Sequence, residues 1–81
     1  MNIKRLKNNQ CVSDNVNMRI VAAQQHFNVE LSKKDKDCRV RKALCAKADK
    51  ELLYELLKDK DPRVREQAAY FIKFRGLENE N

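Results

Sequence analysis

The side chains that most often carry out catalysis or bind metals are scarce in this 81-residue chain. It has three cysteines, Cys11, Cys38 and Cys45, and a single histidine, His26. A structural metal site needs about four converging ligands, and the chain has no Cys-x-x-Cys or His-x-x-x-His pair. A catalytic Cys–His pair has no supporting motif either. We therefore expect buried or incidental thiols, a surface histidine, no metal or cofactor, and no enzymatic activity.

Basic residues are the abundant class of side chain with binding chemistry. The chain has 18 lysines and arginines against 12 aspartates and glutamates, a net charge of +6. This excess favours encounters with anionic partners. It is concentrated in residues 33–50, which hold eight basic and three acidic residues, and at Lys4, Arg5 and Lys7. No recognised DNA- or RNA-binding motif accompanies it, so the charge alone does not establish nucleic-acid binding.

A repeated segment organises the chain. Residues 35–41 (DKDCRVR) recur as residues 59–65 (DKDPRVR), with six of seven positions identical at an offset of 24 residues. The same offset applied once more places Val16 under Val40 and Ser13 under Asp37, with Asn17 in place of Arg41. We predict a single domain with units at about 13–36, 37–60 and 61–76, a basic arm or partial helix at 1–12, and a tail at 77–81.

Each unit is predicted to contain two short helices. Ser13, Asp37 and Asp61 are suitable N-caps, and Pro62 suits the first helical position. Helical spacing predicts one inward face in each of the later copies, with Val40, Ala43, Leu44, Lys47 and Ala48 in one and Val64, Gln67, Ala68, Phe71 and Ile72 in the other. Residues 50–58 predict a second helix, residues 26–34 a ragged or irregular one, and Gly76 the end of the last helix. Such units bury their apolar faces only by stacking.

The stretch at residues 52–69 (LLYELLKDKDPRVREQAA) resembles HEAT-like repeats, which have leucines, an Asp-Pro turn, Val-Arg and an alanine pair. The 24-residue period is closest to the leucine-rich repeat variant. The resemblance covers roughly residues 13–74 and implies an all-α fold, a short right-handed α-solenoid of about three two-helix repeats. It also implies a structural ladder between units, formed by Asp35, Arg41, Asp59 and Arg65. The iron–sulfur cysteine cluster of some variant-repeat proteins has no counterpart here.

Two surfaces are candidates for binding. The first is the outer side of the last helix, with Tyr70, Phe71 and Phe74, together with Ile72, which we expect to be partly uncovered. The second is a pair of parallel basic rows at helix N-terminal turns, where free backbone donors and the helix dipole favour phosphate. Its predicted residues are Lys33, Lys34, Lys36, Arg39, Lys58, Lys60 and Arg63. Lysine-rich loops are also often simply solvated, and Asp37 and Asp61 occupy the caps themselves.

The sequence favours a protein-binding module, an adaptor or a small regulator or inhibitor of a larger partner. The alternative is a nucleic-acid binder that contacts the phosphate backbone, and self-association through the last helix is compatible with either. Apolar stretches such as residues 20–23 fall far short of the roughly 20 residues needed to span a bilayer. Residues 1–10 lack a secretory signal, and three cysteines form an odd number. We therefore expect a cytoplasmic protein with reduced thiols and no membrane association.

Overall fold

The computed structural model describes residues 13–77, which are mostly helical and contain no strand. The all-α prediction is therefore confirmed. The elements in chain order are α2 (Val16–Gln24), α3 (Val29–Lys33), α4 (Cys38–Ala43), the 3₁₀ helix η1 (Leu44–Lys47), α5 (Lys50–Leu56) and α6 (Pro62–Phe74). The basic arm predicted at 1–12 and the tail beyond Leu77 lie outside the described residues.

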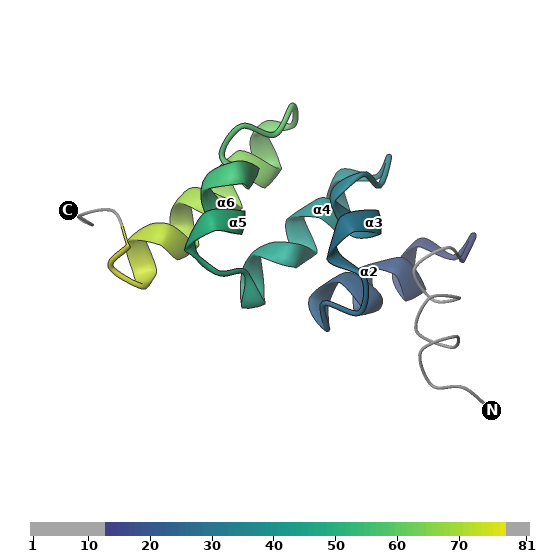
Figure 1. Cartoon of the computed structure of the whole chain (residues 1–81). Helices are drawn as coiled ribbons and strands as arrows, with labels where there is room; N and C mark the ends of the chain where they lie inside the picture. Colours follow the sequence, from purple (N-terminus) through teal and green to yellow (C-terminus); the bar gives the residue numbers. More distant parts are fainter. Residues whose placement is uncertain (1–12, 78–81) are drawn as a thin grey trace.

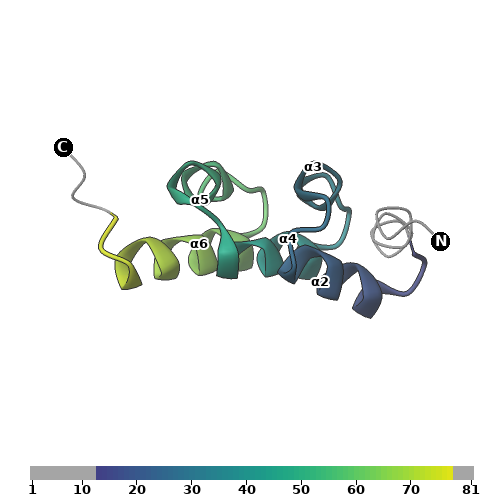
Figure 2. The ribbon, with the colours of Figure 1, turned by 60° about the horizontal axis from the view of Figure 1, so that its bottom comes forward.

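The helices lie in two rows along an elongated body of about 45 × 23 × 16 Å. Figure 2 shows α2, α4 and α6 following one another in one row, with α3 and α5 in the other. Within the first row, α4 packs against both α2 and α6. The two ends of the described part, at residues 13 and 77, lie at opposite ends of the body (Figure 1). Helices therefore stack in the order in which they occur in the sequence.

The core runs between the rows and between successive helices of the first row. Its fully or nearly buried apolar residues are Ala22, Ala23, Val40, Leu44, Cys45, Ala48, Leu53, Leu56, Val64, Ala68 and Ile72. Six of them lie on the two predicted inward faces, in α4, in η1 and just after it, and in α6: Val40, Leu44, Ala48, Val64, Ala68 and Ile72. The expectation that Ile72 is partly uncovered on the outer side of the last helix is wrong. Ile72 lies four residues after Ala68 on the inward face and is only 5% exposed. Arg41 on α4 and Cys45 on η1, which the periodicity did not place on an inward face, are also buried.

Helix N-caps set the start of each helix in the first row. Asp37 and Asp61 cap α4 and α6 as predicted, each accepting a hydrogen bond from the backbone N–H two residues on at 2.8 Å. The prediction of Ser13 as the cap of α2 is wrong. Asn15 is the cap, and its side chain accepts from Asn17 N at 2.9 Å.

The first repeat is two residues shorter than the 24-residue offset predicts. Asn15 N donates to Ser13 Oγ, as Asp37 N donates to Asp35 Oδ1, so Ser13 corresponds to Asp35 and not to Asp37. Helix α3 has five residues and α5 has seven, which accounts for the difference. The irregular helix predicted at 26–34 is this short α3.

Two residues in the left-handed conformation end the longer helices. Gly76, with φ 67°, ends α6 as predicted, and His26, with φ 54°, ends α2. In both cases the next N–H donates to a carbonyl five residues back, from Leu77 to Ile72 and from Phe27 to Ala22. His26 is half-buried, and its Nε2 lies 2.9 Å from Leu44 O. The histidine expected at the surface therefore closes a helix and joins two units.

Candidate binding surfaces

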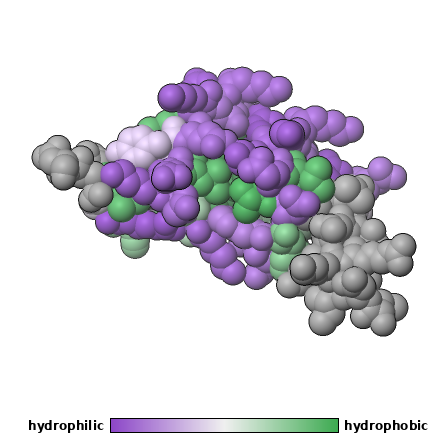
Figure 3. All heavy atoms as spheres, viewed as in Figure 1, coloured by the Kyte–Doolittle hydropathy of each residue, from purple (hydrophilic) through white to green (hydrophobic). Residues whose placement is uncertain are grey.

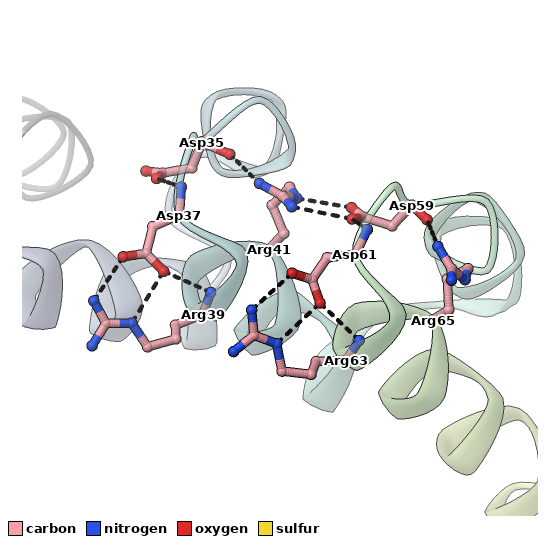
Figure 4. A network of polar contacts seen from close by, with 8 residues as sticks. All are labelled: Asp35, Asp37, Arg39, Arg41, Asp59, Asp61, Arg63 and Arg65. Carbon is pink, nitrogen blue, oxygen red and sulfur yellow. Dashed lines mark hydrogen bonds and ion pairs between the residues drawn. The ribbon is translucent and has the colours of Figure 1, made fainter.

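Arg41 joins the turn before α4 to the turn before α6 (Figure 4). Its Nε and Nη2 donate to the two carboxylate oxygens of Asp59 at 2.8 and 3.2 Å. Its Nη1 donates to the backbone oxygen of Asp35 at 2.6 Å. The two paired side chains are 6% and 9% exposed, so this ion pair is buried between successive units.

Arg19 makes the equivalent contact one unit earlier. Its Nε donates to Asp35 Oδ2 at 2.9 Å, and its Nη1 donates to Ser13 O at 2.6 Å. Sequence reasoning missed this arginine, because the 24-residue offset assigned its place to Asn17. Aligning residues 13–19 with residues 35–41, at an offset of 22, would have revealed it.

Arg65 repeats only half of this geometry. Its Nη1 donates to Asp59 O at 2.7 Å, as Arg41 does to Asp35 O. The side chain is exposed, and no carboxylate within residues 13–77 forms an ion pair with it. Among the residues assigned to the ladder, the side-chain pair thus joins Arg41 to Asp59, and Arg65 lies at the end of the series.

Three of the seven predicted phosphate-binding cations are held by carboxylates. Arg39 donates to both oxygens of Asp37, and Arg63 to both oxygens of Asp61, at 2.7–3.1 Å. The hydrogen bonds from Arg39 lower the pKa of Asp37 to about 2, and those from Arg63 lower the pKa of Asp61 further below its usual range. Both aspartates are therefore ionised at neutral pH and offset the charge of their arginines.

Lys33 is the third of these cations. Its Nζ lies 2.8 Å from a carboxylate oxygen of Glu55 and 3.2 Å from one of Glu30. The hydrogen bonds to Glu55 and Glu30 raise the pKa of Lys33. This lysine joins α3 to α5 in the second row of helices.

The other four predicted cations, Lys34, Lys36, Lys58 and Lys60, are exposed, and none forms an ion pair within the described residues. Three of them line two successive hollows between neighbouring turns. One hollow, of about 360 Å³, is lined by Lys34 and Lys36 beside Arg19. The next, of about 450 Å³, is lined by Lys36 and Lys60 beside Arg41. Aspartates line both hollows, so neither is uniformly positive.

An aromatic cluster of Tyr70, Phe71 and Phe74 lies on α6. Tyr70 is 57% exposed and Phe74 is 65% exposed, whereas Phe71 is half-buried. The Tyr70 ring meets the Phe71 and Phe74 rings edge-on, at centroid distances of 5.1 and 5.7 Å. The Arg75 guanidinium lies 5.4 Å from the Phe71 ring and donates to the carbonyls of Ala46 and Ala48. These contacts hold the end of α6 against the preceding unit and leave two aromatic rings in solvent.

Elsewhere the surface is largely hydrophilic, with hydrophobic residues exposed between polar ones on the face seen in Figure 3. The exposed large apolar residues outside the cluster are Met18, Val21, Leu31 and Tyr54. The hydroxyl of Tyr54 donates to Leu77 O at 3.3 Å. Each of these side chains is less exposed than Tyr70 and Phe74.

One of the two thiols in the described part of the chain is buried. Cys38 and Cys45 are both free, and burial raises the pKa of Cys45 to about 11, so this thiol is protonated at neutral pH. Within residues 13–77, no group of three or more His, Cys, Asp and Glu side chains is placed to hold a metal ion. The same residues contain no helix with the length and apolar content needed to cross a membrane.

No protein-family model, curated protein or solved structure matches the chain.

Proposed function

We propose that this chain is a short right-handed α-solenoid of the HEAT-like class, closest to the leucine-rich repeat variant, and that it is a non-enzymatic protein-binding module. The two rows of helices and the repeated arginine–aspartate pairs support the solenoid. As a protein-binding module it would be an adaptor or a small regulator or inhibitor of a larger partner. A cytoplasmic location is part of the proposal, since free thiols suit a reducing compartment.

The exposed aromatic cluster is the observation that carries the proposal. Tyr70 and Phe74 are large apolar side chains, and more than half of each is open to solvent. Aromatic residues, tyrosine in particular, are enriched at protein interfaces and among the residues that contribute most to binding energy. The backbone beneath them is held by Arg75, so the cluster presents a preorganised surface to a partner.

Capture from lysate on the immobilised full chain tests this proposal. Phe74→Asp and Tyr70→Asp place a charge in the cluster, while Val21→Asp, at an exposed apolar position on α2, serves as the matched control. We expect partners held by the wild-type chain and by Val21→Asp to be lost from the two cluster variants. Retention of every specific partner by both cluster variants would exclude this surface.

Self-association is a separate outcome. Sedimentation over a range of concentrations would show whether a second copy occupies the cluster, since Phe74→Asp would then convert the oligomer to monomer. A chain that stays monomeric at all concentrations leaves a different protein as the partner.

Phosphate-backbone binding is the second candidate, favoured by the four exposed lysines with no ion pair in the described structure. Affinity for duplex DNA or RNA would then fall steeply with salt, by a slope of about 0.9 per phosphate contact on DNA. Lys36→Gln combined with Lys60→Gln should reduce the slope by about 2, whereas Lys42→Gln, on α4 outside these turns, should matter less. Absence of binding at low salt would exclude this candidate.

A further inference from the structure

Three arginines, Arg19, Arg41 and Arg65, occupy equivalent positions in the first turns of α2, α4 and α6, and within residues 13–77 only the first two pair with a carboxylate. We propose that Arg65 and the adjoining side of α6 form a docking site for a helix of a partner protein whose preceding turn presents an aspartate. The inference rests on the proposed function, protein binding, and specifies the chemistry of the partner.

The geometry of the two filled positions is the same. In each, Nη1 donates to the backbone oxygen six residues earlier, from Arg19 to Ser13 and from Arg41 to Asp35, both at 2.6 Å. This bond aims the rest of the guanidinium at the following unit. There Nε meets a carboxylate oxygen, of Asp35 at 2.9 Å and of Asp59 at 2.8 Å.

Arg65 is oriented in the same way but is open. Its Nη1 bond to Asp59 O, at 2.7 Å, reproduces the backbone anchor, and Figure 4 shows it beyond Asp59 at the end of the network. Its Nε and Nη2 have no carboxylate acceptor among residues 13–77. A planar guanidinium with two free donors is suited to bind a carboxylate through two hydrogen bonds.

The surface beside Arg65 is open as well. Cys45 on η1 is fully buried, and η1 packs against α6 as well as against α2 and α4. The residue 24 positions later, Ala69, is exposed. Because Ala69 is small, a helix can approach α6 closely at this point. The occupant is therefore expected to combine an apolar helix face over Ala69 with an aspartate over Arg65.

A second copy of this chain fits the site less well. The start of its own series would have to supply the acidic residue, and there Ser13 stands where Asp35 and Asp59 stand in the later units. Charge complementarity therefore favours a different protein with an aspartate at this place.

Extending the chain by one unit tests the docking site without knowledge of the partner. A second copy of residues 49–72 inserted after Ile72 keeps the 24-residue period and places a copied Asp59 over Arg65. We expect the added unit to be helical and to raise the midpoint of a single thermal transition. Arg65→Gln should then lower the midpoint by several degrees in the extended chain and by less than about 2 °C in the parent chain.

The copied aspartate provides the matched control. Changing it to asparagine in the extended chain should lower the thermal midpoint as much as Arg65→Gln does. Combining the two changes should lower it little further, because they remove the same contact. Equal effects of Arg65→Gln in the parent and extended chains would overturn the proposal. So would an added unit that stays disordered, since it carries the residues that fill the other two positions.

The same substitution tests docking in trans on a partner found by capture. Arg65→Gln should lower the affinity for that partner by at least tenfold. Arg63→Gln, at an exposed arginine on the first turn of the same helix, should lower it by less than threefold. If a partner is lost with Phe74→Asp but binds the Arg65→Gln variant as tightly as the wild-type chain, docking at Arg65 is refuted and the proposed function is not. Failure to capture any partner through the cluster would refute the proposed function, while the extended chain still decides whether the site accepts an aspartate-bearing helix.

Discussion

The seven residues that form the turn before α4 and its first turn are almost the same as those before and at the start of α6, yet the two regions differ in what covers them. In both, the N-cap aspartate accepts hydrogen bonds from the arginine two residues later. In both, a second arginine donates to the backbone oxygen six residues before it. Arg41 and Cys45 are buried, however, whereas Arg65 and Ala69 are exposed. The short motif thus sets the local geometry, and the neighbouring unit sets the burial.

A charge introduced at Cys45 should have a much larger effect than one introduced at the equivalent Ala69, and this is the strongest difference expected between the two regions. Cys45→Asp places a carboxylate in a fully buried site, at a cost of several kcal/mol, which is comparable to the whole stability expected of a domain of this size. We expect Cys45→Asp to abolish the cooperative thermal transition and Ala69→Asp to retain it. Similar circular-dichroism melting curves for both variants would show that the two positions are equally exposed.

The arginine pair should show the next largest difference. Arg41→Gln leaves the buried carboxylate of Asp59 without its partner, and we expect the free energy of unfolding to fall by about 3 kcal/mol. Arg65→Gln should change it by about 0.5 kcal/mol or less. Urea denaturation of both variants measures the difference, and equal losses would mean that the Arg41–Asp59 pair contributes nothing beyond the local backbone bond.

Acid should weaken the capped turns before α4 and α6. The pKa of Asp37 lies near 2 in the folded chain, against an ordinary value of 3.8, and the pKa of Asp61 is lowered as well. A carboxyl whose pKa is lowered by folding stabilises the fold above its ordinary pKa and loses that effect as the pH falls toward its folded value. We expect the thermal midpoint to fall between about pH 4 and pH 2.

Asparagine at both positions is the control for this pH dependence. Asparagine remains a good N-cap, as Asn15 is for α2, but it does not titrate. The thermal midpoint of the variant with Asp37→Asn and Asp61→Asn should therefore fall less than that of the wild-type chain over the same pH range. A loss as large as that of the wild-type chain would assign the acid sensitivity to other carboxylates.

The smallest effect is expected at the aromatic cluster. Tyr70→Ala and Phe74→Ala remove rings that are mostly in solvent, so each should change the free energy of unfolding by about 1 kcal/mol or less. Ile72→Ala, in the same stretch of α6 but buried, should cost about 2–5 kcal/mol. Large losses for Tyr70→Ala and Phe74→Ala in urea denaturation would mean that the cluster belongs to the core.

Much of the helical content and most inward positions could be predicted from the chain. Asp37, Asp61 and Pro62 mark helix starts because their preferences act within a few residues. Helical periodicity correctly predicted Val40, Leu44, Val64 and Ala68 as buried residues. The start of α2 was mispredicted, because Ser13 and Asn15 replace the aspartates of the later copies and a shorter α3 shifts the alignment by two residues.

The candidate surfaces were harder to predict. The sequence shows which residues are basic or aromatic, but the partners of Arg39, Arg63 and Lys33 depend on rotamers and on neighbouring helices. Arg19 was missed because the 24-residue offset misaligns the first copy by two residues, which also misplaced the start of α2. The exposure of Tyr70 and Phe74 on the last helix was expected and is confirmed, whereas Phe71, expected on the same surface, is half-buried.

The sequence by itself determined the helices, their caps and their inward faces, because these depend on preferences and spacings within about one turn of chain. Only the tertiary structure decided that Arg41 is buried against Asp59 while Arg65, in the same local motif, is open. The physical reason is that burial and ion pairing between units require a neighbour, and for α6 no neighbour of this kind is present among residues 13–77.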